Sequence, residues 1–372
     1  MSQLQASTEH NSDAELMLRC CHLAAKAAGH TAPNPLVGSV VAQAGAIVGE
    51  GFHPKAGEPH AEIFALRAAG DRAQGGTLYV NLEPCNHTGR TPPCSDAVIG
   101  AGIRRVVIGM RDPNPQAKGG VEKLRQAGIE VIVGVEEARC RQLNEAFIHR
   151  VTYRQPFGIL KYAMTLDGKI ATSTGHSAWI SGPSSRQQVH QLRSQCDAVI
   201  VGGNTVRKDN PNLTSHGEGD RNPLRIVMSR QLDLPTAANL WKVETAPTLV
   251  FTQTDANLEV KAALVRQGVE VEALKSLTPE AVMERLYQRG LMSVLWECGG
   301  RLAAAAIAAG TVQKIWAFIA PKLIGGSGAP SPVGELGFEK MTEALSLESV
   351  SVTPVGQDFL LEGYLPSLRT HV

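Results

Sequence analysis

The feature that most constrains this chain is a group of one histidine, two cysteines and one glutamate carried by two short segments. Glu62 follows His60 by two residues in the first segment, and Cys85 and Cys94 delimit the second. A catalytic zinc site has three protein ligands and an open position for water, whereas a structural zinc site usually has four protein ligands. We therefore predict one Zn²⁺ per chain, held by His60, Cys85 and Cys94, with Glu62 as the proton-transferring residue.

The surrounding sequence places these ligands on regular elements. It predicts a helix over 61–67 that begins beside His60, a buried strand over 77–82 that ends before Cys85, and a helix over 95–101 that Cys94 opens. Helix N-termini favour thiolates. The pattern H-x-E followed by P-C-x-x-C is typical of zinc deaminases. Here eight residues separate the two cysteines. A chance grouping and a purely structural metal are the alternatives.

The composition limits the compartment and the partners. A length of 372 residues favours two domains. Thirty-six basic against 35 acidic residues, without a basic run, argue against a nucleic-acid surface. Seven cysteines, an odd number, with no secretory segment before them indicate free thiols, so we expect a cytoplasmic protein. No apolar run is long enough to cross a membrane, and no membrane partner is expected.

Helices and strands alternate twice along the chain, which predicts two α/β units. In the first unit, residues 1–10 are expected to be loose, a helix is expected to start at Ser12 and Asp13, and another helix should cover 136–149. Residues 152–156 are expected to form a linker. The second unit should begin with a strand at Phe157 and hold a sheet covered by helices on both faces. Antiparallel strands are expected over 347–364.

Two glycine pairs in the second unit follow predicted strands and open predicted helices. They are Gly202-Gly203 and Gly299-Gly300. Such turns present backbone N–H groups to phosphate, and open α/β sheets bind ligands at the carboxyl ends of their strands. Tight packing is the alternative for a bare double glycine. The G-x-G-x-x-G pattern is absent, so an ordinary dinucleotide-binding fold is not predicted.

The same residues resemble a known family nearly end to end. The chain is similar to the bifunctional bacterial enzymes of riboflavin biosynthesis in which a pyrimidine deaminase is fused to a reductase. The matching blocks are 33–38, 57–62, 83–94, 112–115, 165–169, 179–180, 205–209 and 297–300. The resemblance implies a cytidine-deaminase-like α/β/α sandwich over 1–152 and a dihydrofolate-reductase-like α/β domain over 156–372.

The resemblance also implies roles for individual residues. For the deaminase substrate these are Asn34 and His53 at the pyrimidine, with His87, Arg90 and Thr91 at the ribose phosphate. A solvated loop is the alternative for His87 and Arg90. The implied reductase substrate residues are Lys161, which also holds or polarises the sugar, Ser177, Arg193, Leu213 and Glu297. The implied NADPH residues are Ala163, Trp179, Thr205, Asp209, Gly299, Gly300, Arg301, Leu302, Ala303, Ala304 and Ala305.

The activities implied are two successive steps on small pyrimidine ribosyl phosphates. The first is hydrolytic deamination of 2,5-diamino-6-(5-phosphoribosylamino)pyrimidin-4-one to 5-amino-6-(5-phosphoribosylamino)uracil. The second is NADPH-dependent reduction of the ribosyl group to ribityl. A homodimer or homotetramer is expected. The rival interpretations are a nucleic-acid-editing deaminase with an unrelated appendage and a binding protein with one decayed half.

Two positions depart from the family pattern. His216 stands where relatives often carry an arginine, so Arg193, Lys161 or Arg221 are the alternative phosphate contacts. Arg230 stands in a turn where relatives often have serine, and both a contact with the NADPH 2′-phosphate and a solvated turn remain open.

Overall fold

The computed structural model describes residues 2–87 and 92–366, with the side chains of the first helix described from Asp13 onward. The chain divides into two compact units, residues 1–154 and 155–372, and each is described by itself. Among the described residues, no helix is long and apolar enough to cross a membrane.

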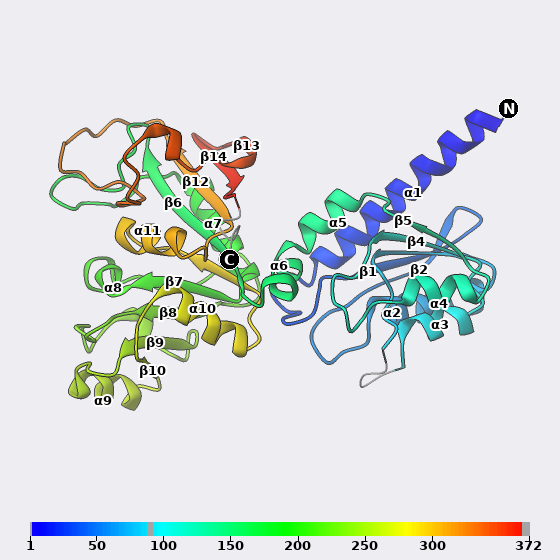
Figure 1. Cartoon of the computed structure of the whole chain (residues 1–372), viewed down its shortest axis with the longest axis horizontal. Coiled ribbons are helices and arrows are strands. Elements are labelled where there is room, and N and C mark those ends of the chain that lie inside the picture. The colour runs from blue at the N-terminus through cyan, green and yellow to red at the C-terminus, as the bar shows by residue number, and fades with distance from the viewer. Residues whose placement is uncertain (1, 88–91, 367–372) are drawn as a thin grey trace. The chain divides into compact units, whose positions relative to one another are not determined.

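The first unit is built on a five-stranded mixed sheet in the order β2-β1-β3-β4-β5 (Figure 1). Its antiparallel part pairs β1 with both β2 and β3, and β3, β4 and β5 are parallel. The strand bounds are β1 (Gly38–Gln43), β2 (Ala46–Phe52), β3 (Thr77–Leu82), β4 (Arg105–Met110) and β5 (Glu130–Val133). The parallel strands are short apolar runs, as strands buried on both faces should be.

Helices cover both faces of this sheet (Figure 1). The first group of helices consists of α1 (Ser2–Ala25), α5 (Glu137–Leu143) and α6 (Glu145–Tyr153). The second group consists of α2 (Ala61–Ala69), the short turn η1 (Gly70–Ala73), α3 (Cys94–Gly100) and α4 (Gly120–Gln126). Glycine lets helices lie close to the strands. A Cβ on Gly38 would lie 2.1 Å from the Cys20 carbonyl oxygen of α1, and one on Gly51 would lie 2.7 Å from the Ala61 carbonyl oxygen of α2.

Four expectations about the first unit were wrong. Helix α1 begins at Ser2, so residues 2–10 are helical rather than loose, and the helix does not start at Ser12. Asp13 does not cap it, because its buried carboxylate accepts hydrogen bonds from Tyr79 and Arg105. The expected single helix over 136–149 is two helices separated by Asn144. Residues 152 and 153 belong to α6 rather than to a linker, and Arg154, which follows the helix, has a left-handed φ of 56°.

The second unit contains a nine-stranded sheet in the order β10-β9-β8-β7-β11-β6-β12-β14-β13 (Figure 1). In this order, the seven strands from β10 through β12 run parallel to one another. Strands β14 and β13 follow them and are antiparallel to their neighbours. The bounds are β6 (Phe157–Thr165), β7 (Ala198–Gly202), β8 (Leu224–Met228), β9 (Thr248–Gln253), β10 (Glu270–Leu274), β11 (Ser293–Trp296), β12 (Lys314–Ala320), β13 (Glu348–Val355) and β14 (Asp358–Tyr364).

Helices pack on both faces of the second sheet, as the apolar strands predicted. Their bounds are α7 (Pro183–Gln195), α8 (Gly203–Asp209), α9 (Leu258–Arg266), α10 (Pro279–Gln288) and α11 (Gly300–Ala308), with short turns η2 (Asn239–Trp241) and η3 (Met341–Glu343). Leu286 of α10 and Ile307 of α11 join one apolar core with Trp296. Val189 of α7 joins a separate cluster with Phe318 and Leu360. Both glycine pairs therefore lie where a strand gives way to a helix.

Candidate active sites

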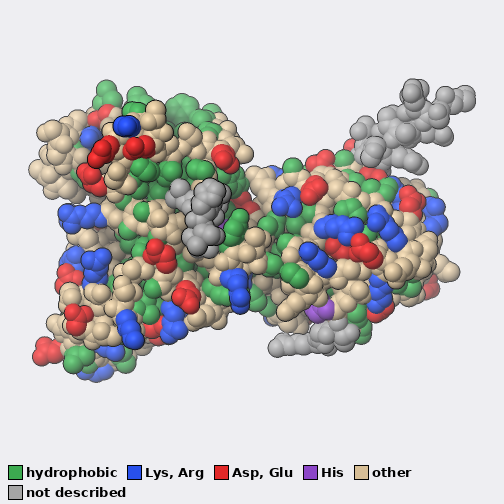
Figure 2. All heavy atoms as spheres, in the orientation of Figure 1, with side chains coloured by type: hydrophobic (Ala, Val, Ile, Leu, Met, Phe, Trp, Pro, Cys, Tyr) green, Lys and Arg blue, Asp and Glu red, His purple; other side chains and the backbone are tan. Residues whose placement is uncertain are grey.

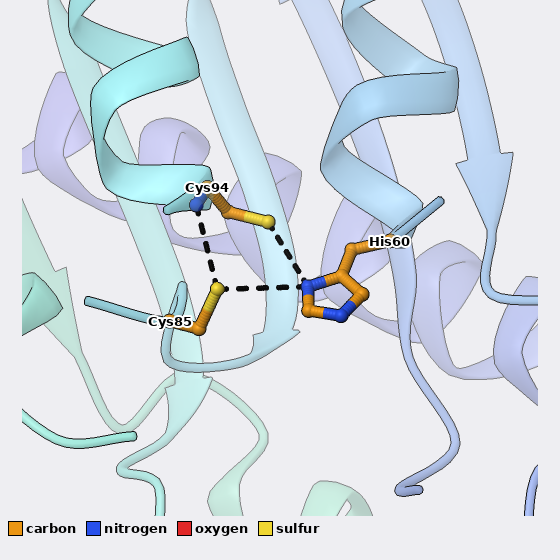
Figure 3. Close-up of side chains that lie close together, drawn as sticks. All are labelled: His60, Cys85 and Cys94. Atoms are coloured by element: carbon orange, nitrogen blue, oxygen red, sulfur yellow. Dashed lines mark hydrogen bonds between the residues drawn. The ribbon is translucent and has the colours of Figure 1, made fainter. Parts of the chain in front are cut away.

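The first site gathers one histidine and two cysteines from three elements (Figure 3). His60 precedes α2, Cys85 follows β3, and Cys94 is the first residue of α3. The Nδ1 atom of His60 lies 3.1 Å from the Cys94 Sγ and 3.6 Å from the Cys85 Sγ, and the Cys94 backbone N–H donates to the Cys85 Sγ at 3.4 Å. The three candidate ligand atoms lie within 4.8 Å of one another. One nitrogen and two sulfur donors form a set that suits zinc.

The electrostatics of this cluster favour a thiolate. Hydrogen bonding from the Cys94 side chain, opposed by burial and supported by His60, lowers the pKa of the Cys85 thiol to about 4. A thiolate, rather than a thiol, is the form that binds a metal. The residues present therefore fit a zinc ion in donor type.

Glu62 lies in the first turn of α2 and is 3% exposed. Burial raises the pKa of its carboxyl group to about 7. Its Oε2 is one of the few buried polar side-chain atoms of the described residues that have no hydrogen-bond partner. An unpaired buried oxygen costs free energy unless something else satisfies it. This oxygen is therefore available to a water molecule or substrate beside the cluster.

Asn34 and His53 form a linked pair next to the cluster. The His53 Nδ1 lies 3.0 Å from the Pro59 carbonyl oxygen, which can only accept, so Nδ1 carries the proton. Its Nε2 then accepts from the Asn34 Nδ2 at 3.1 Å. Burial lowers the pKa of His53, which favours the neutral ring. The rings of His53 and His60 meet edge to face at 5.6 Å.

Two buried asparagines that the sequence analysis did not single out hold the segment after Asn34. The Asn144 side chain accepts a hydrogen bond from the Leu36 N–H at 2.8 Å and donates one to the Leu36 carbonyl oxygen at 3.0 Å. Asn81 accepts from the Gly38 N–H at 2.8 Å and donates to the Leu36 carbonyl oxygen at 2.9 Å. Both amides pair with backbone far away in the sequence, so no local pattern marks them.

The loop between the two cysteines is described only in part. His87 is exposed. Arg90 and Thr91 lie outside the described residues.

The second unit contains a cavity of about 930 Å³ where β6, β7 and β11 end and α7, α8 and α11 begin or pass. It brings together most of the residues expected to bind the reductase substrate and NADPH. Those that line it are Lys161, Ala163, Ser177, Trp179, Arg193, Thr205, Asp209, Glu297, Gly299, Gly300, Arg301 and Leu302. Leu213, Ala303, Ala304 and Ala305 are not among the lining residues, and Ala303 and Ala304 are buried in α11.

Three charged side chains form an ionic cluster in the cavity wall. Arg193 donates to both carboxylate oxygens of Glu297, through Nε at 2.6 Å and Nη2 at 2.9 Å. The Lys161 Nζ lies 3.7 Å from the Glu297 Oε2. Burial alone would raise the pKa of Glu297, but Arg193 and Lys161 outweigh it and lower the pKa to about 2. Burial lowers the pKa of Lys161.

Trp179 stands at the cavity with 71% of its surface exposed. The Arg186 guanidinium lies 4.5 Å from the centre of its ring. Lys322 donates to the carbonyl oxygens of Trp179 and Ile180, at 2.7 and 2.8 Å. Arg186 and His190 of α7 also line the cavity, although the sequence analysis did not single them out. Arg186, His190 and Arg193 are four and three positions apart, and this helical spacing was the available signal.

The two departures from the family pattern lie in different surroundings. The His216 ring stacks on the ring of His190, with centroids 4.2 Å apart. Arg230 is exposed and is not among the residues that line the cavity.

The two units match two enzyme domains. Residues 11–110 match the cytidine and deoxycytidylate deaminase zinc-binding region, and residues 156–361 match the RibD C-terminal domain. Fold and sites thus define a zinc deaminase joined to a reductase. The chain is 62% identical to the riboflavin biosynthesis protein RibD of Synechocystis sp. over 355 residues, which are 95% of this chain and 96% of that protein. The chain belongs to the RibD family of bifunctional riboflavin biosynthesis enzymes.

Solved structures agree with this assignment. A Thermotoga maritima diaminohydroxyphosphoribosylaminopyrimidine deaminase/5-amino-6-(5-phosphoribosylamino)uracil reductase is 38% identical with a TM-score of 0.86, covering 96% of this chain and 100% of that one. The RibD of Acinetobacter baumannii is 36% identical with a TM-score of 0.85, covering 96% and 99%. The expected fold class, the two activities and the cofactors zinc and NADPH are confirmed. The enzyme acts on small molecules.

Proposed function

We propose that residues 1–152 deaminate 2,5-diamino-6-(5-phosphoribosylamino)pyrimidin-4-one and that residues 156–372 reduce the ribosyl group of the product, 5-amino-6-(5-phosphoribosylamino)uracil, to ribityl. The observation that carries this proposal is the presence of two chemically different sites in two separate units of one chain. The printed name of the Thermotoga maritima relative describes the same two steps.

In the deaminase unit, His60, Cys85 and Cys94 would hold the zinc ion. Zinc in such a site supplies Lewis acidity that makes water a nucleophile near neutral pH. Glu62 takes a proton from the attacking water and passes it to the ring and then to the departing ammonia. Its unpaired buried Oε2 supports this role.

The same unit would bind the substrate through two groups of residues. Asn34 and His53 would hold the pyrimidine, and their neutral, hydrogen-bonded arrangement supports this role. His87, Arg90 and Thr91 would hold the ribose phosphate from the loop between the cysteines. An arginine fork suits phosphate oxygens.

In the reductase unit, Lys161 would hold or polarise the opened sugar, supported by its place beside Glu297 in the cavity wall. NADPH supplies the hydride that the sugar carbon receives. Ser177, Arg193, Leu213 and Glu297 would complete the substrate site. Ala163, Trp179, Thr205, Asp209 and residues 299–305 would bind NADPH. Gly299 supports this, because a Cβ at that position would meet no atom within 4 Å and the backbone is open to approach.

We also propose that two or four copies associate through the second unit in the cytoplasm. Apolar side chains there are exposed on the edge strand β13 and on the segment before it, among them Leu323, Met341, Val350 and Val352. A second copy would cover them. The seven free cysteines support a reducing compartment. On the face drawn in Figure 2, basic and acidic side chains are interspersed, which does not favour a nucleic-acid partner.

The test combines zinc content with NADPH consumption. The purified chain should contain one zinc per chain, release ammonia from the diamino substrate without NADPH, and oxidise NADPH only after the deaminated product has formed. A chelator should abolish the first step alone. Oxidation of NADPH with the diamino substrate while ammonia release is blocked would contradict the proposed order of steps.

A further inference from the structure

A loop of the reductase unit is attached along one face of α7 by three regularly spaced contacts. Gln187 donates to Glu218 at 3.1 Å, the rings of His190 and His216 stack, and the Arg193 Nη1 donates to the Thr214 carbonyl oxygen at 3.0 Å. The helix positions 187, 190 and 193 are three apart, so they share one face. The loop positions 218, 216 and 214 run in the opposite direction.

The loop is also fixed from within. The N–H and hydroxyl of Ser215 donate to the Asn222 side chain at 2.9 and 3.0 Å. Gly219 lies so close to α7 that an added Cβ would be 2.5 Å from the side chain of Ser194. His216 itself has a left-handed φ of 51°, a conformation that few non-glycine residues adopt. These contacts fix the backbone of the loop that carries the ring stacked on His190.

His190 lines the reductase cavity, whereas His216 is not among the lining residues. The ionisable groups near the His190 ring are His216, Arg193, Glu297 and Glu218, and Lys161 belongs to the same cavity wall. Burial, followed by His216 and Arg193, lowers the pKa of His190 to about 4. At neutral pH its ring is uncharged and has one nitrogen that donates and one that accepts.

Arg193 is largely occupied within the protein. Its guanidinium already donates twice to Glu297 and once to Thr214. His190 lies one turn earlier on the same helix face. Among the described residues, its ring stacks on His216 but has no hydrogen-bond partner. The two glycine turns proposed for NADPH open α8 and α11, whereas α7 contributes Arg193 to the ionic cluster at which the sugar is proposed to bind.

We propose that His190 is a substrate-binding residue of the reductase, which hydrogen-bonds an oxygen of the phosphoribosyl group, and that His216 is the residue that positions it. The proposal rests on the proposed reductase function and extends it. His216 then contributes to phosphoribosyl recognition through the ring of His190 and not by direct contact.

The test measures steady-state kinetics with the deaminated substrate. His190→Phe keeps the ring but removes both nitrogens, and it should raise the substrate KM about tenfold, as expected for a lost hydrogen bond to a polar ligand. The KM for NADPH should not change. His190→Gln, which keeps a donor and an acceptor, should recover part of the loss. His216→Ala should shift the substrate KM toward that of His190→Phe, while His216→Phe, which can still stack, should recover it.

Gln191→Ala is the matched control, because Gln191 is exposed on the same helix and does not line the cavity. Calorimetric titration of each variant with ribose 5-phosphate and with ribose measures binding without turnover, and the comparison shows which oxygens are recognised. In one outcome, the wild-type enzyme binds ribose 5-phosphate more tightly than His190→Phe does and yet fails to reduce the deaminated substrate. That result would count against the proposed reaction but would support the proposed binding role of His190. An unchanged substrate KM and unchanged sugar binding in both His190 variants, or a raised KM for NADPH alone, would overturn the inference.

Discussion

Arg193 and Glu297 form a two-point ion pair between α7 and the end of β11, with N–O distances of 2.6 and 2.9 Å. The pair joins residues 104 positions apart, and Lys161 from β6 approaches the same carboxylate. The carboxylate side chain is 9% exposed, so the pair is shielded from water. Removing one partner of a shielded pair leaves the other charge buried and costs more than an exposed pair would.

This ion pair predicts that the free energy of unfolding of the reductase unit decreases at low pH. The pKa of Glu297 is about 2 in the folded chain, whereas its ordinary value is 4.5. As the pH falls, the carboxylate is therefore protonated in the unfolded chain before it is protonated in the folded chain. The stabilisation is complete above about pH 4.5 and is lost as the pH falls through about 2. Glu297→Gln should lower stability by about 3 kcal/mol at pH 7. Calorimetric Tm values should converge with wild-type as the pH falls through this window. The exposed Glu335 provides a control as Glu335→Gln, and a pH-independent difference for Glu297→Gln would contradict the assignment.

Glu62→Gln should abolish deamination and leave zinc bound. The amide keeps the shape of the side chain but cannot take the proton, and general acid–base catalysis contributes about 10²–10⁴ in rate. NADPH oxidation with the deaminated substrate should continue at the wild-type rate, which serves as the internal control. Zinc content by atomic absorption checks the distinction, since loss of zinc in this variant would make Glu62 a ligand.

Cys94→Ser should release zinc and destabilise the first unit. Cys94 is 1% exposed at the start of α3, so the vacated site would open in the core of the sandwich. A tightly bound ligand present at about a thousandfold above its Kd contributes about 4 kcal/mol, which corresponds to a Tm lowered by about 10 °C in a unit of this size. Cys140→Ser is the control, because Cys140 is equally buried but outside the cluster. Full zinc occupancy in Cys94→Ser would show that the site has been assigned to the wrong residues.

The two units should work after separation between Arg154 and Gln155. Each unit has its own sheet and its own core, and α6 ends at Tyr153, one residue before the proposed cut follows Arg154. A fragment of residues 1–154 should release ammonia from the diamino substrate, and a fragment of residues 155–372 should bind NADPH and reduce the deaminated substrate. Fluorescence titration with NADPH and an ammonia assay measure both. A well-folded second fragment that binds no NADPH would refute the placement of the cofactor at Gly299, Thr205 and Asp209, whereas a preference for NADH would leave that placement intact.

The part of this enzyme that could be predicted from sequence is the part encoded in short stretches. His60 and Glu62 lie within one helical turn, and Cys85 and Cys94 each adjoin the end of a regular element, so residue type and spacing were enough to indicate a zinc site. The strand that begins at Phe157 was predicted because it is an apolar run, whereas β10 and β12 were not predicted. The break of the helix at Asn144 was missed, because the asparagine is held by Leu36, 108 positions away.

The sequence alone determined which chemistry each half can perform, since metal ligands, a proton carrier and glycine turns are local patterns read at fixed spacing. Only the tertiary structure decided which side chains share a cavity wall. The parallel order β7-β11-β6-β12 places Lys161 beside Glu297, and the packing of α7 places Arg193 against the same carboxylate and His190 against His216. Such contacts depend on strand register and on helix packing, which arise from burial of apolar surface across the whole unit and leave no periodic signal near any one of these residues.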